Sequence, residues 1–311
     1  MATLKDIAAA AGVSITVVSD VLNQKSRTRR VAQATSEKVL AVAARLGYAP
    51  NLHARALVLQ RTYLVGLVAA SIHSSFYGGI IAGFLERAEG AGLRVMLSYT
   101  QRSGERAAAA CSEMVRRGAE GVAFLEELPV FRRPPPVPMA ATHQLRARRR
   151  LSVVAVDHAQ GAALAVRHLL QQGRRRIALV GDDIDDRLGT AHRLLEEAGA
   201  AAIHCRPAEL PQRVREGIDG AFAAKDFAAI EALGELLSAG LGVPRDCALI
   251  GYDDLQVAAA VRPALSSISQ PKEEYGRVLA DLLLEQLAGR PARAVLLTPE
   301  LVTRSSSRPD G

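Results

Sequence analysis

Residues 153–181 read VVAVDHAQGAALAVRHLLQQGRRRIALVG: an apolar run, an amphipathic stretch and a second apolar run. The two apolar runs, SVVAV and RIALVG, are typical of buried strands, and Ala162 to Gln172 has the spacing of a helix. Asp157 and Gln160 have the spacing of a capping box at the start of that helix. This order predicts two parallel strands joined by a helical crossover.

The same alternation extends through most of the chain. Further strands are predicted at LVGLVAA (64–70), LRVMLSY (93–99), GVAFL (121–125), VPMAA (137–141) and CALIGY (247–252). Further helices are predicted at 78–91, 105–117, 226–239 and 273–288. Such alternation indicates parallel sheets with helices on both faces, an α/β fold.

Size and composition exclude several protein classes. The chain has 311 residues, of which 49% are hydrophobic and 23% charged, so it is globular and long enough for more than one core. No apolar run is long enough to span a bilayer, and the amino terminus lacks a signal sequence, so the expected location is the cytoplasm. The three cysteines, Cys111, Cys205 and Cys247, are expected to be reduced and buried.

No motif points to catalysis or to a cofactor. The chain has no G-x-G-x-x-G after its first strand, no G-x-x-x-x-G-K and no G-x-S-x-G. Its cysteines lack nearby partners at metal-ligand spacing. We therefore expect no cofactor, no metal and no enzyme activity.

Positive charge is concentrated at the amino terminus. The whole chain carries a formal net charge of +7, and residues 1–61 hold nine Lys or Arg against three acidic residues. The remaining residues carry 30 basic against 29 acidic groups. A basic segment beside a near-neutral body is typical of a protein that binds phosphate backbones. A solvated basic tail is the alternative, unless the segment folds.

The basic segment has the pattern of a folded three-helix unit. Thr3 and Asp6 have capping-box spacing, so a helix is expected from Leu4 to a Gly12 terminus. Ser14 can cap a second helix that ends at Leu22. Two short helices joined by such a turn predict a helix-turn-helix, whose second helix lies in the major groove of DNA. Ile15, Thr16 and Asp20 are expected to face outward there, and a third helix, Gln33 to Leu46, is expected to complete the core with Val39, Leu40, Val42, Ala43 and Leu46.

The runs TLKDIAAAAGVS (3–14), VSDVLN (18–23) and EKVLAVAARLGYAPNLHARAL (37–57) closely resemble the head and hinge of the lac repressor (LacI/GalR) family of transcription regulators. The resemblance implies that Pro50 to Val58 is a hinge that becomes helical on operator DNA. It places Leu57 as a wedge in the minor groove, beside Ala54 and Arg55. The alternative for Leu57 is a linker leucine that packs on the body.

The head departs from that family at several positions. Val17 and Asp20 stand where the family usually has Thr and Arg, and Ala32 stands at a serine cap. Asp20 could accept a hydrogen bond from cytosine or form a salt bridge to a nearby arginine, and both possibilities stay open. The loop 23–30 is longer and more basic than usual, which favours phosphate contacts. The residues predicted to contact DNA are Thr3, Ser14, Ile15, Thr16, Ser19, Asp20, Asn23, Arg27, Arg29, Arg30, Ala54, Arg55 and Leu57.

The body is similar to the effector-binding core of the same family. Besides 153–181, the matching runs are VPRDCALIGYDDLQVAAAVRPALSSISQP (243–271) and LLTPELVTRSS (296–306). The resemblance implies two doubly wound parallel-sheet subdomains, as in type I periplasmic binding proteins, behind a helix-turn-helix headpiece. The implied boundaries are a headpiece at 1–48, a hinge at 49–61 and a core at 62–311, in which 62–156 plus 271–292 form one subdomain and 157–270 plus 293–304 the other.

Six residues that follow strands are predicted to bind the effector, since ligands of open α/β sheets bind beyond the carboxyl ends of strands. Arg187 matches the family's cleft arginine, or is a surface residue at a helix start. Asp253 matches an acidic ligand contact, or is a helix cap. Lys225 and Asp226 stand where the family commonly has Asn-Asp, and Lys225 would suit an anionic effector. The remaining two are Ser71 and Phe76, of which Phe76 is equally well explained as a core residue.

Together these observations favour a dimeric, operator-specific transcription regulator, with a tetramer as the alternative assembly. It is expected to be a repressor whose partners are double-stranded operator DNA and a small-molecule effector, a sugar, a sugar derivative or a nucleoside-like molecule, with a sugar-like molecule favoured. A dimer is expected because one head reads only a half-site. Two alternatives remain open. One is a solute-binding protein or enzyme that shares only the body fold, and the other is a regulator whose body has lost its effector response and serves only for dimerisation.

Overall fold

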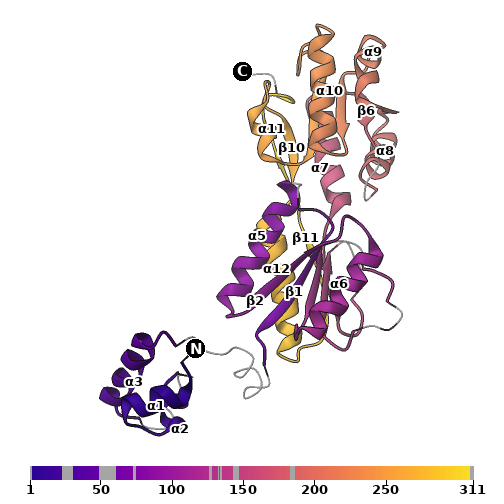
Figure 1. Ribbon diagram of the computed structural model, residues 1–311. Helices are drawn as coiled ribbons and strands as arrows, with labels where there is room; N and C mark the ends of the chain where they lie inside the picture. Colours follow the sequence, from indigo (N-terminus) through magenta and orange to yellow (C-terminus); the bar gives the residue numbers. More distant parts are fainter. Residues whose placement is uncertain are drawn as a thin grey trace. The chain divides into compact units, whose positions relative to one another are not determined.

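The computed structural model describes residues 2–22, 31–48, 61–72, 75–125, 128–131, 133, 135–142, 147–182 and 186–308. The chain divides into two compact units, residues 1–62 and 63–311, which are called the head and the body below. The head carries helices and the body carries two mixed helix and sheet halves (Figure 1).

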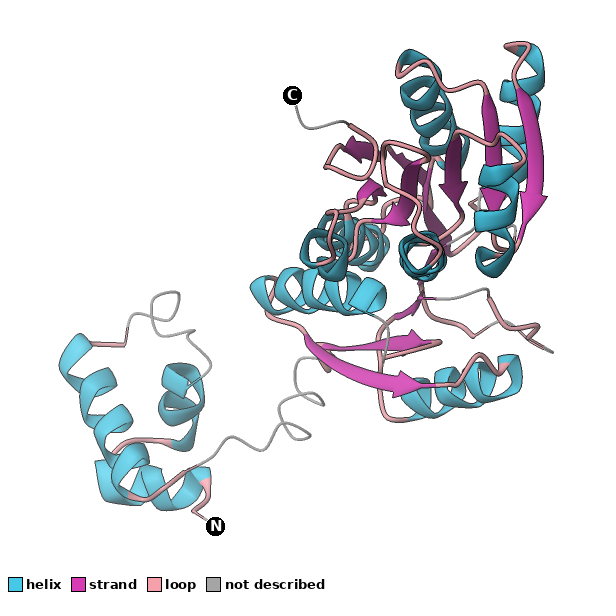
Figure 2. Ribbon diagram, turned by 90° about the horizontal axis from the view of Figure 1, so that it is seen from above, coloured by secondary structure: helices cyan, strands magenta, loops and turns pink. Residues whose placement is uncertain are grey.

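The described part of the head is helical (Figure 2). It contains α1 (Leu4–Ala11), α2 (Ile15–Leu22) and α3 (Gln33–Arg45). Helices this short are marginally stable alone, so they depend on packing against one another. The residues that pack recur at helical spacing and form one apolar face on each helix. The buried core residues are Ile7, Ala8, Ala11, Val18, Val21, Val39, Val42 and Ala43.

The predicted ends of the first two helices of the head are confirmed. The hydroxyl of Thr3 accepts a hydrogen bond from the Asp6 amide at 3.3 Å, and the Asp6 carboxylate accepts one from the Thr3 amide at 2.8 Å. Gly12 ends α1 with φ 68°, a left-handed conformation that favours glycine. The Ser14 hydroxyl accepts from the Val17 amide at 3.3 Å and so caps α2. At Ala32, by contrast, no side chain caps α3.

Two core predictions for the third helix are wrong. Leu40 is 52% exposed and Leu46 is 38% exposed. Val39, Val42 and Ala43 share one face at i, i+3 and i+4, and Leu40 lies about 100° further round the helix. The helix ends at Arg45, so Leu46 no longer follows its periodicity.

The first half of the body contains a six-stranded sheet in the order β11-β5-β4-β3-β1-β2, with every pair parallel. One face is covered by α5 and α12, whose side chains share a core with β1 and β5, and the other by α6. The elements are β1 (Leu64–Ala69), α5 (Ser75–Gly90), β2 (Arg94–Tyr99), α6 (Gly104–Arg116), β3 (Val122–Leu125), β4 (Met139–Thr142), β5 (Leu151–Val156), α12 (Lys272–Leu287) and β11 (Ala294–Leu297).

The second half holds another six-stranded sheet, in the order β12-β10-β9-β8-β6-β7. Alternate residues of β6 point to opposite cores, one beneath α7 and α8 and the other beneath α9, α10 and α11. The elements are α7 (His158–Gln171), β6 (Arg176–Val180), α8 (Arg187–Glu197), β7 (Ala201–Cys205), the 3₁₀ turn Pro207–Glu209, α9 (Leu210–Arg215), β8 (Gly220–Ala223), α10 (Asp226–Ser238), β9 (Ala248–Asp253), α11 (Gln256–Ala260), β10 (Ser266–Ser269) and β12 (Glu300–Val302).

The predicted boundary at residue 293 is wrong. Ala294–Leu297 forms β11, which pairs in parallel with β5 in the first sheet. Leu297 is buried in the core of that half, so packing holds the segment there. Only β12 returns to the second sheet, where it pairs antiparallel with β10 as an edge strand.

Candidate nucleic-acid interface and ligand site

The amino end of α2 is open to solvent. Ile15 is 44% exposed, and Ser14 and Thr16 are also exposed. An apolar side chain beside two hydroxyls can contact a thymine methyl group and hydrogen-bond base edges. Ser19, one turn further along, is half-buried. This end of the helix therefore has the chemistry that a major-groove reader needs.

Thr3 and Ser14 already serve as helix caps. The Thr3 hydroxyl both accepts from the Asp6 amide and donates to the Asp6 carboxylate at 2.8 Å. The hydrogen bonds that the Thr3 amide and the Thr3 hydroxyl donate to the Asp6 carboxylate lower the pKa of that carboxyl below its ordinary value. Both caps stand at helix amino ends, where backbone N–H groups favour phosphate.

Asp20 does not face outward as predicted, because it is only 8% exposed. Asp20 follows Val17 by three residues and so shares its helix face, and Val17 packs against the head core. The sequence-based prediction placed Asp20 on the outside of the helix because its side chain is polar. The other predicted DNA contacts lie outside the described residues: Asn23, Arg27, Arg29, Arg30, Ala54, Arg55 and Leu57.

In the body, four predicted ligand residues lie beyond the carboxyl ends of adjacent strands. β9, β8 and β6 are neighbours in the second sheet and run parallel. Asp253 ends β9, Lys225 and Asp226 follow β8, and Arg187 begins the helix that follows β6. The topology thus brings together residues that are up to 66 positions apart.

Arg187 and Asp253 form a nearly buried ion pair. Arg187 Nη1 lies 3.4 Å from Asp253 Oδ1, and the two side chains are 5% and 13% exposed. The same nitrogen donates to the Ala224 carbonyl at 2.9 Å, and the guanidinium carbon lies 3.9 Å from the centre of the Tyr252 ring. Burial raises the pKa of Asp253, although Arg187 opposes this shift. The interpretation of Arg187 as a surface residue is therefore wrong.

The loop after β9 is held by side chains that the sequence did not single out. Asp253 and Asp254 have positive φ angles of 103° and 47°, which surrounding contacts must stabilise. Lys272 Nζ donates to their carbonyl oxygens at 2.7 and 3.1 Å, and Gln270 Nε2 donates to Asp253 Oδ1 at 2.7 Å. α11 begins after Leu255, so Asp253 is not its cap.

The residues that sequence reasoning missed here are Tyr252, Gln270 and Lys272. Gln270 directly follows β10, a strand that was not predicted, so a correct strand assignment would have found it. Tyr252 is fully buried, and its hydroxyl lies 2.9 Å from His158 Nδ1. Gly161 permits this packing, because a Cβ there would lie 2.4 Å from the Tyr252 hydroxyl.

Asp226 cannot contact a ligand directly, because it is fully buried. Its two carboxylate oxygens accept hydrogen bonds from the Leu255 amide at 2.7 Å and from the Ser267 hydroxyl at 2.6 Å. Asp226 therefore ties the start of α10 to the segments after β9 and in β10. Its burial raises its pKa to about 7.

The free energy of unfolding of the Asp226→Asn variant, relative to that of the wild type, is expected to increase as pH rises from about 4 to about 7. The carboxyl ionises at its ordinary pKa of 3.8 in the unfolded chain but near 7 in the folded protein. Between these values the unfolded chain has fewer bound protons, so the wild-type free energy of unfolding falls as pH rises. Asparagine can hydrogen-bond both partners without a charge. Urea unfolding at several pH values measures the difference.

Asp246→Asn is the matched control. Hydrogen bonds from Arg245 lower the pKa of the half-buried Asp246 to about 2, so Asp246 stays ionised in both states above pH 5. Its effect should then be constant from pH 5 to pH 7. If the effect of Asp226→Asn on the free energy of unfolding is also constant with pH, Asp226 is ionised in both the folded and the unfolded state over this range. The conclusion that burial raises its pKa would then be wrong.

Lys225 is exposed and lines a cavity of about 560 Å³ at the carboxyl ends of β6, β7 and β8. Arg206 adds a second positive charge to the lining, and Asp182 and Glu231 add two negative charges. This balance gives the cavity no net preference for an anion.

Ser71 and Phe76 lie at the carboxyl end of the first sheet rather than the second. Ser71 is half-buried, and the Phe76 ring packs against the core of that half, with its centre 5.5 Å from that of Tyr77. No hydrogen bond or ion pair joins either residue to the Arg187–Asp253 pair in the described part of the chain.

All three cysteines are free and buried, as predicted, and burial raises their thiol pKa values to about 11 or 12. Among the residues that the structure describes, no cluster of three or more His, Cys, Asp or Glu is arranged to hold a metal ion. None of the described helices has the length and apolar character needed to cross a bilayer.

Two known families match the two parts of the chain. Residues 3–51 match the bacterial regulatory proteins of the lacI family, and residues 166–307 match the periplasmic binding protein-like domain. The HTH-type transcriptional regulator CelR of Thermobifida fusca is 31% identical, over 97% of this chain and 98% of its own length. The ribose operon repressor of Escherichia coli (strain K12) is 28% identical, over 99% of this chain and 100% of its own.

Solved structures match the whole chain as well. The lac repressor dimer bound to operator and the anti-inducer ONPF has a TM-score of 0.83 and 26% identity, over 98% of this chain and 99% of that one. The complex of CelR with cellobiose has a TM-score of 0.66 and 28% identity, over 99% and 100%. A helix-turn-helix head on a two-sheet binding body defines a DNA-binding transcription regulator. The chain belongs to the lacI family of bacterial regulatory proteins.

Proposed function

We propose that the protein is a dimeric repressor that binds a near-palindromic operator and changes its affinity when a small, sugar-like molecule binds the body. The observation that carries the proposal is the exposed amino end of α2, presented by a capped three-helix head. Ile15 and Thr16 would read base edges, and the capped amino ends at Thr3 and Ser14 would contact phosphates. Two copies are needed because each head reads one half-site.

Three parts of this proposal rest on sequence alone. Residues 1–48 would form the DNA-binding headpiece, 49–61 the hinge and the remainder the binding core. Arg27, Arg29 and Arg30 would contact phosphates. Leu57 would unstack a base step in the minor groove, with Ala54 and Arg55 beside it.

The effector would bind at the accessible part of the Arg187–Asp253 pair and beside Lys225. A guanidinium donates and a carboxylate accepts, which suits the hydroxyl groups of a sugar. The charge balance of the neighbouring cavity supports a neutral ligand over an anionic one. The relatives agree in class: CelR was solved with cellobiose, and another relative is a ribose operon repressor.

α12 would transmit the signal from this site. Its first residue, Lys272, binds the backbone of Asp253 and Asp254 in the second half of the body. Near its other end, Gln286 donates to the Met139 carbonyl at 2.8 Å and to the Ser152 hydroxyl at 2.9 Å. These hydrogen bonds lie at the amino edge of the first sheet, where the chain arrives from the hinge. A ligand that prefers one arrangement of the two halves would thereby change DNA affinity.

Selection of duplexes from a random-sequence library by the full-length protein tests the DNA-binding part. We expect a near-palindromic consensus bound by two copies. A variant that lacks residues 1–61 should lose this binding and retain sugar binding in calorimetry. Selection of an asymmetric half-site bound tightly by one copy would contradict the dimeric arrangement.

Calorimetry with cellobiose, ribose and other sugars tests the effector part. A sugar that binds should change operator affinity, and Asp253→Asn should weaken that sugar by about tenfold or more, because a hydrogen bond to a charged group contributes about 1.5–3 kcal/mol. If no sugar in a broad panel binds, the effector proposal is wrong and the body serves for dimerisation.

A further inference from the structure

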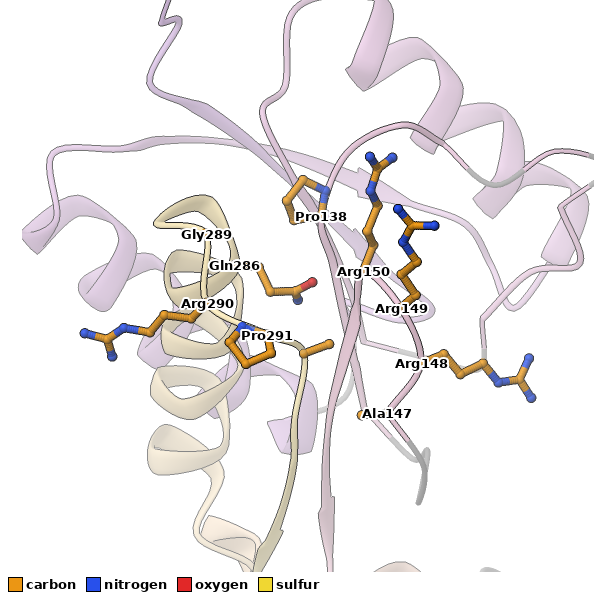
Figure 3. Close-up of a pocket in the computed structure, with 10 residues that line it drawn as sticks. Pro138, Ala147, Arg148, Arg149, Arg150, Gln286, Gly289, Arg290 and Pro291 are labelled. Carbon is orange, nitrogen blue, oxygen red and sulfur yellow. The ribbon is translucent and has the colours of Figure 1, made fainter.

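A second cavity, of about 530 Å³, lies at the amino edge of the first sheet (Figure 3). Four of its lining residues are arginines and none is acidic. Arg148, Arg149 and Arg150 extend from the turn before β5, and Arg290 extends from the segment after α12 (Figure 3). We call these four residues the arginine cluster.

The cluster has little counter-charge. Arg148, Arg149 and Arg150 are exposed, and none of them forms an ion pair with any residue that the structure describes. The Arg150 guanidinium donates to the Pro136 carbonyl at 3.0 Å, which positions it without neutralising it. Arg290 lies 3.9 Å from Glu285, whose carboxylate is already held by Arg293 at 2.8 Å.

Several other surface arginines of this half of the body are paired with carboxylates, although Arg102, Arg106 and Arg133 form no ion pair with a described residue. Arg116 and Arg117 both bind Glu113, at 2.5 and 2.6 Å, and Arg87 binds Asp281 at 2.6 Å. Three consecutive arginines without such partners repel one another. In Figure 3 Arg149 and Arg150 extend to the same side and Arg148 extends away from them, so several anionic groups in a row, rather than one enclosed anion, would reduce that repulsion. Arg forms strong two-pronged hydrogen bonds with phosphate.

The position of the cluster indicates which anion this is. β1, β3, β4 and β5 run parallel, so their first residues share one edge of the sheet. β1 begins at Leu64, just after residues 49–61, and β5 begins at Leu151, just after the cluster. β5 lies three positions from β1 in the sheet, about 14 Å at the usual strand spacing.

The edge that carries the arginine cluster is thus also the edge to which the DNA-binding head is tethered. Thirteen residues, at roughly 3.5 Å each, allow a span of at most about 45 Å, and a hinge that becomes helical on operator DNA, at about 1.5 Å per residue, shortens this span. Duplex DNA carries one negative charge about every 1.7 Å along its axis, so phosphates beyond the half-site are within reach of the tether.

We propose that the arginine cluster binds the phosphate backbone of DNA that flanks the operator half-site. It adds sequence-independent affinity and makes binding depend on duplex length and salt. This inference rests on the proposed function, because it requires the head to hold operator DNA.

The test compares two duplexes. The short duplex contains only the site that the wild type selects from the random library, and the long duplex contains the same site extended by 15 base pairs on each side. The cluster variant is Arg148→Gln, Arg149→Gln and Arg150→Gln together. The control variant is Arg167→Gln, Arg175→Gln and Arg215→Gln, with the same change in charge in the second half of the body. The control is matched, since Arg215 also donates one hydrogen bond to a backbone carbonyl, that of Ala239.

The wild type and the control variant should bind the long duplex more tightly than the short one, with a steeper dependence on salt. The cluster variant should lose this difference and keep its affinity for the short duplex. Affinity for the long duplex falls as salt rises from 50 to 200 mM. For each phosphate that the cluster variant no longer neutralises, this fall should be smaller than that of the wild type by a factor of about 3.5.

Unchanged affinity and salt dependence of the cluster variant on the long duplex would overturn the inference. Equal reductions in the cluster and control variants would also overturn it, because the effect would then be one of net charge. In both cases specific binding to the short duplex would leave the proposed function standing. Failure of the wild type to select any duplex would overturn both.

Discussion

Replacement of Gly276 by alanine is expected to destabilise the body by about 3 kcal/mol, the upper end of the usual cost of overpacking. A Cβ at Gly276 on α12 would lie 1.9 Å from the Ile80 carbonyl oxygen on α5, and one at Gly83 on α5 would lie 2.0 Å from the Glu273 carbonyl oxygen on α12. Backbone atoms cannot rotate away as side chains can. The two helices would therefore have to separate. Urea or thermal unfolding measures the decrease in stability.

Gly78→Ala is the matched control, because Gly78 lies on α5 as well and a Cβ there would meet nothing within 4 Å. Alanine at that site should stabilise the protein by about 0.5–1 kcal/mol through its higher helix propensity. Gly83→Ala should behave like Gly276→Ala. Similar unfolding free energies for all three variants would show that α5 and α12 do not pack this closely.

Arg187→Ala is expected to destabilise the protein by about 3 kcal/mol at pH 8, since it leaves the Asp253 carboxylate buried without its cation. Removal of the cation should raise the pKa of Asp253 further. The folded protein can then take up a proton that the unfolded chain lacks, so the destabilisation should shrink as pH falls from 8 towards 5. Unfolding by urea across this range measures both effects.

A double-mutant cycle separates the ion pair from the packing of Arg187 on Tyr252. Asp253→Asn removes the charge, and asparagine tolerates the positive φ of this position better than most residues do. In that background Arg187→Ala should cost clearly less, with a coupling of about 1–3 kcal/mol. Additive effects would show that Arg187 contributes through contacts other than the ion pair, such as those with the Tyr252 ring and the Ala224 carbonyl.

The proposed ligand site and the α5–α12 helix pair are physically connected. Lys272 begins α12 and binds the loop that carries Asp253, and four residues later Gly276 seats the same helix against α5. A change at the Arg187–Asp253 pair therefore acts on a helix whose lateral position is restricted by close backbone packing.

The sequence by itself determined the features that depend on neighbouring residues in the chain. Thr3, Gly12 and Ser14 set the helix ends of the head through local hydrogen bonds and backbone geometry, and the continuous apolar runs became strands as predicted. The prediction that all of these strands are buried is wrong for β2, which has no buried residue. The order of strands and helices also placed Arg187 and Asp253 at one edge, because parallel strands end together. Short or half-exposed strands such as β7 and β12 were missed, since their residues lack a continuous apolar pattern.

Only the tertiary structure decided which polar residues are buried and which distant segments meet. Asp20 and Asp226 are ionisable residues whose polarity predicted exposure. Asp226 is buried because its carboxyl group meets the Leu255 amide and the Ser267 hydroxyl, which lie far from it in the sequence. β11 belongs to the first sheet because Leu297 finds its core there, and Gln270 and Lys272 reach Asp253 across a crossover between the halves. The reason is physical: helix and strand signals arise from contacts a few residues apart, whereas burial and charge pairing depend on packing between segments that the chain brings together only when it folds.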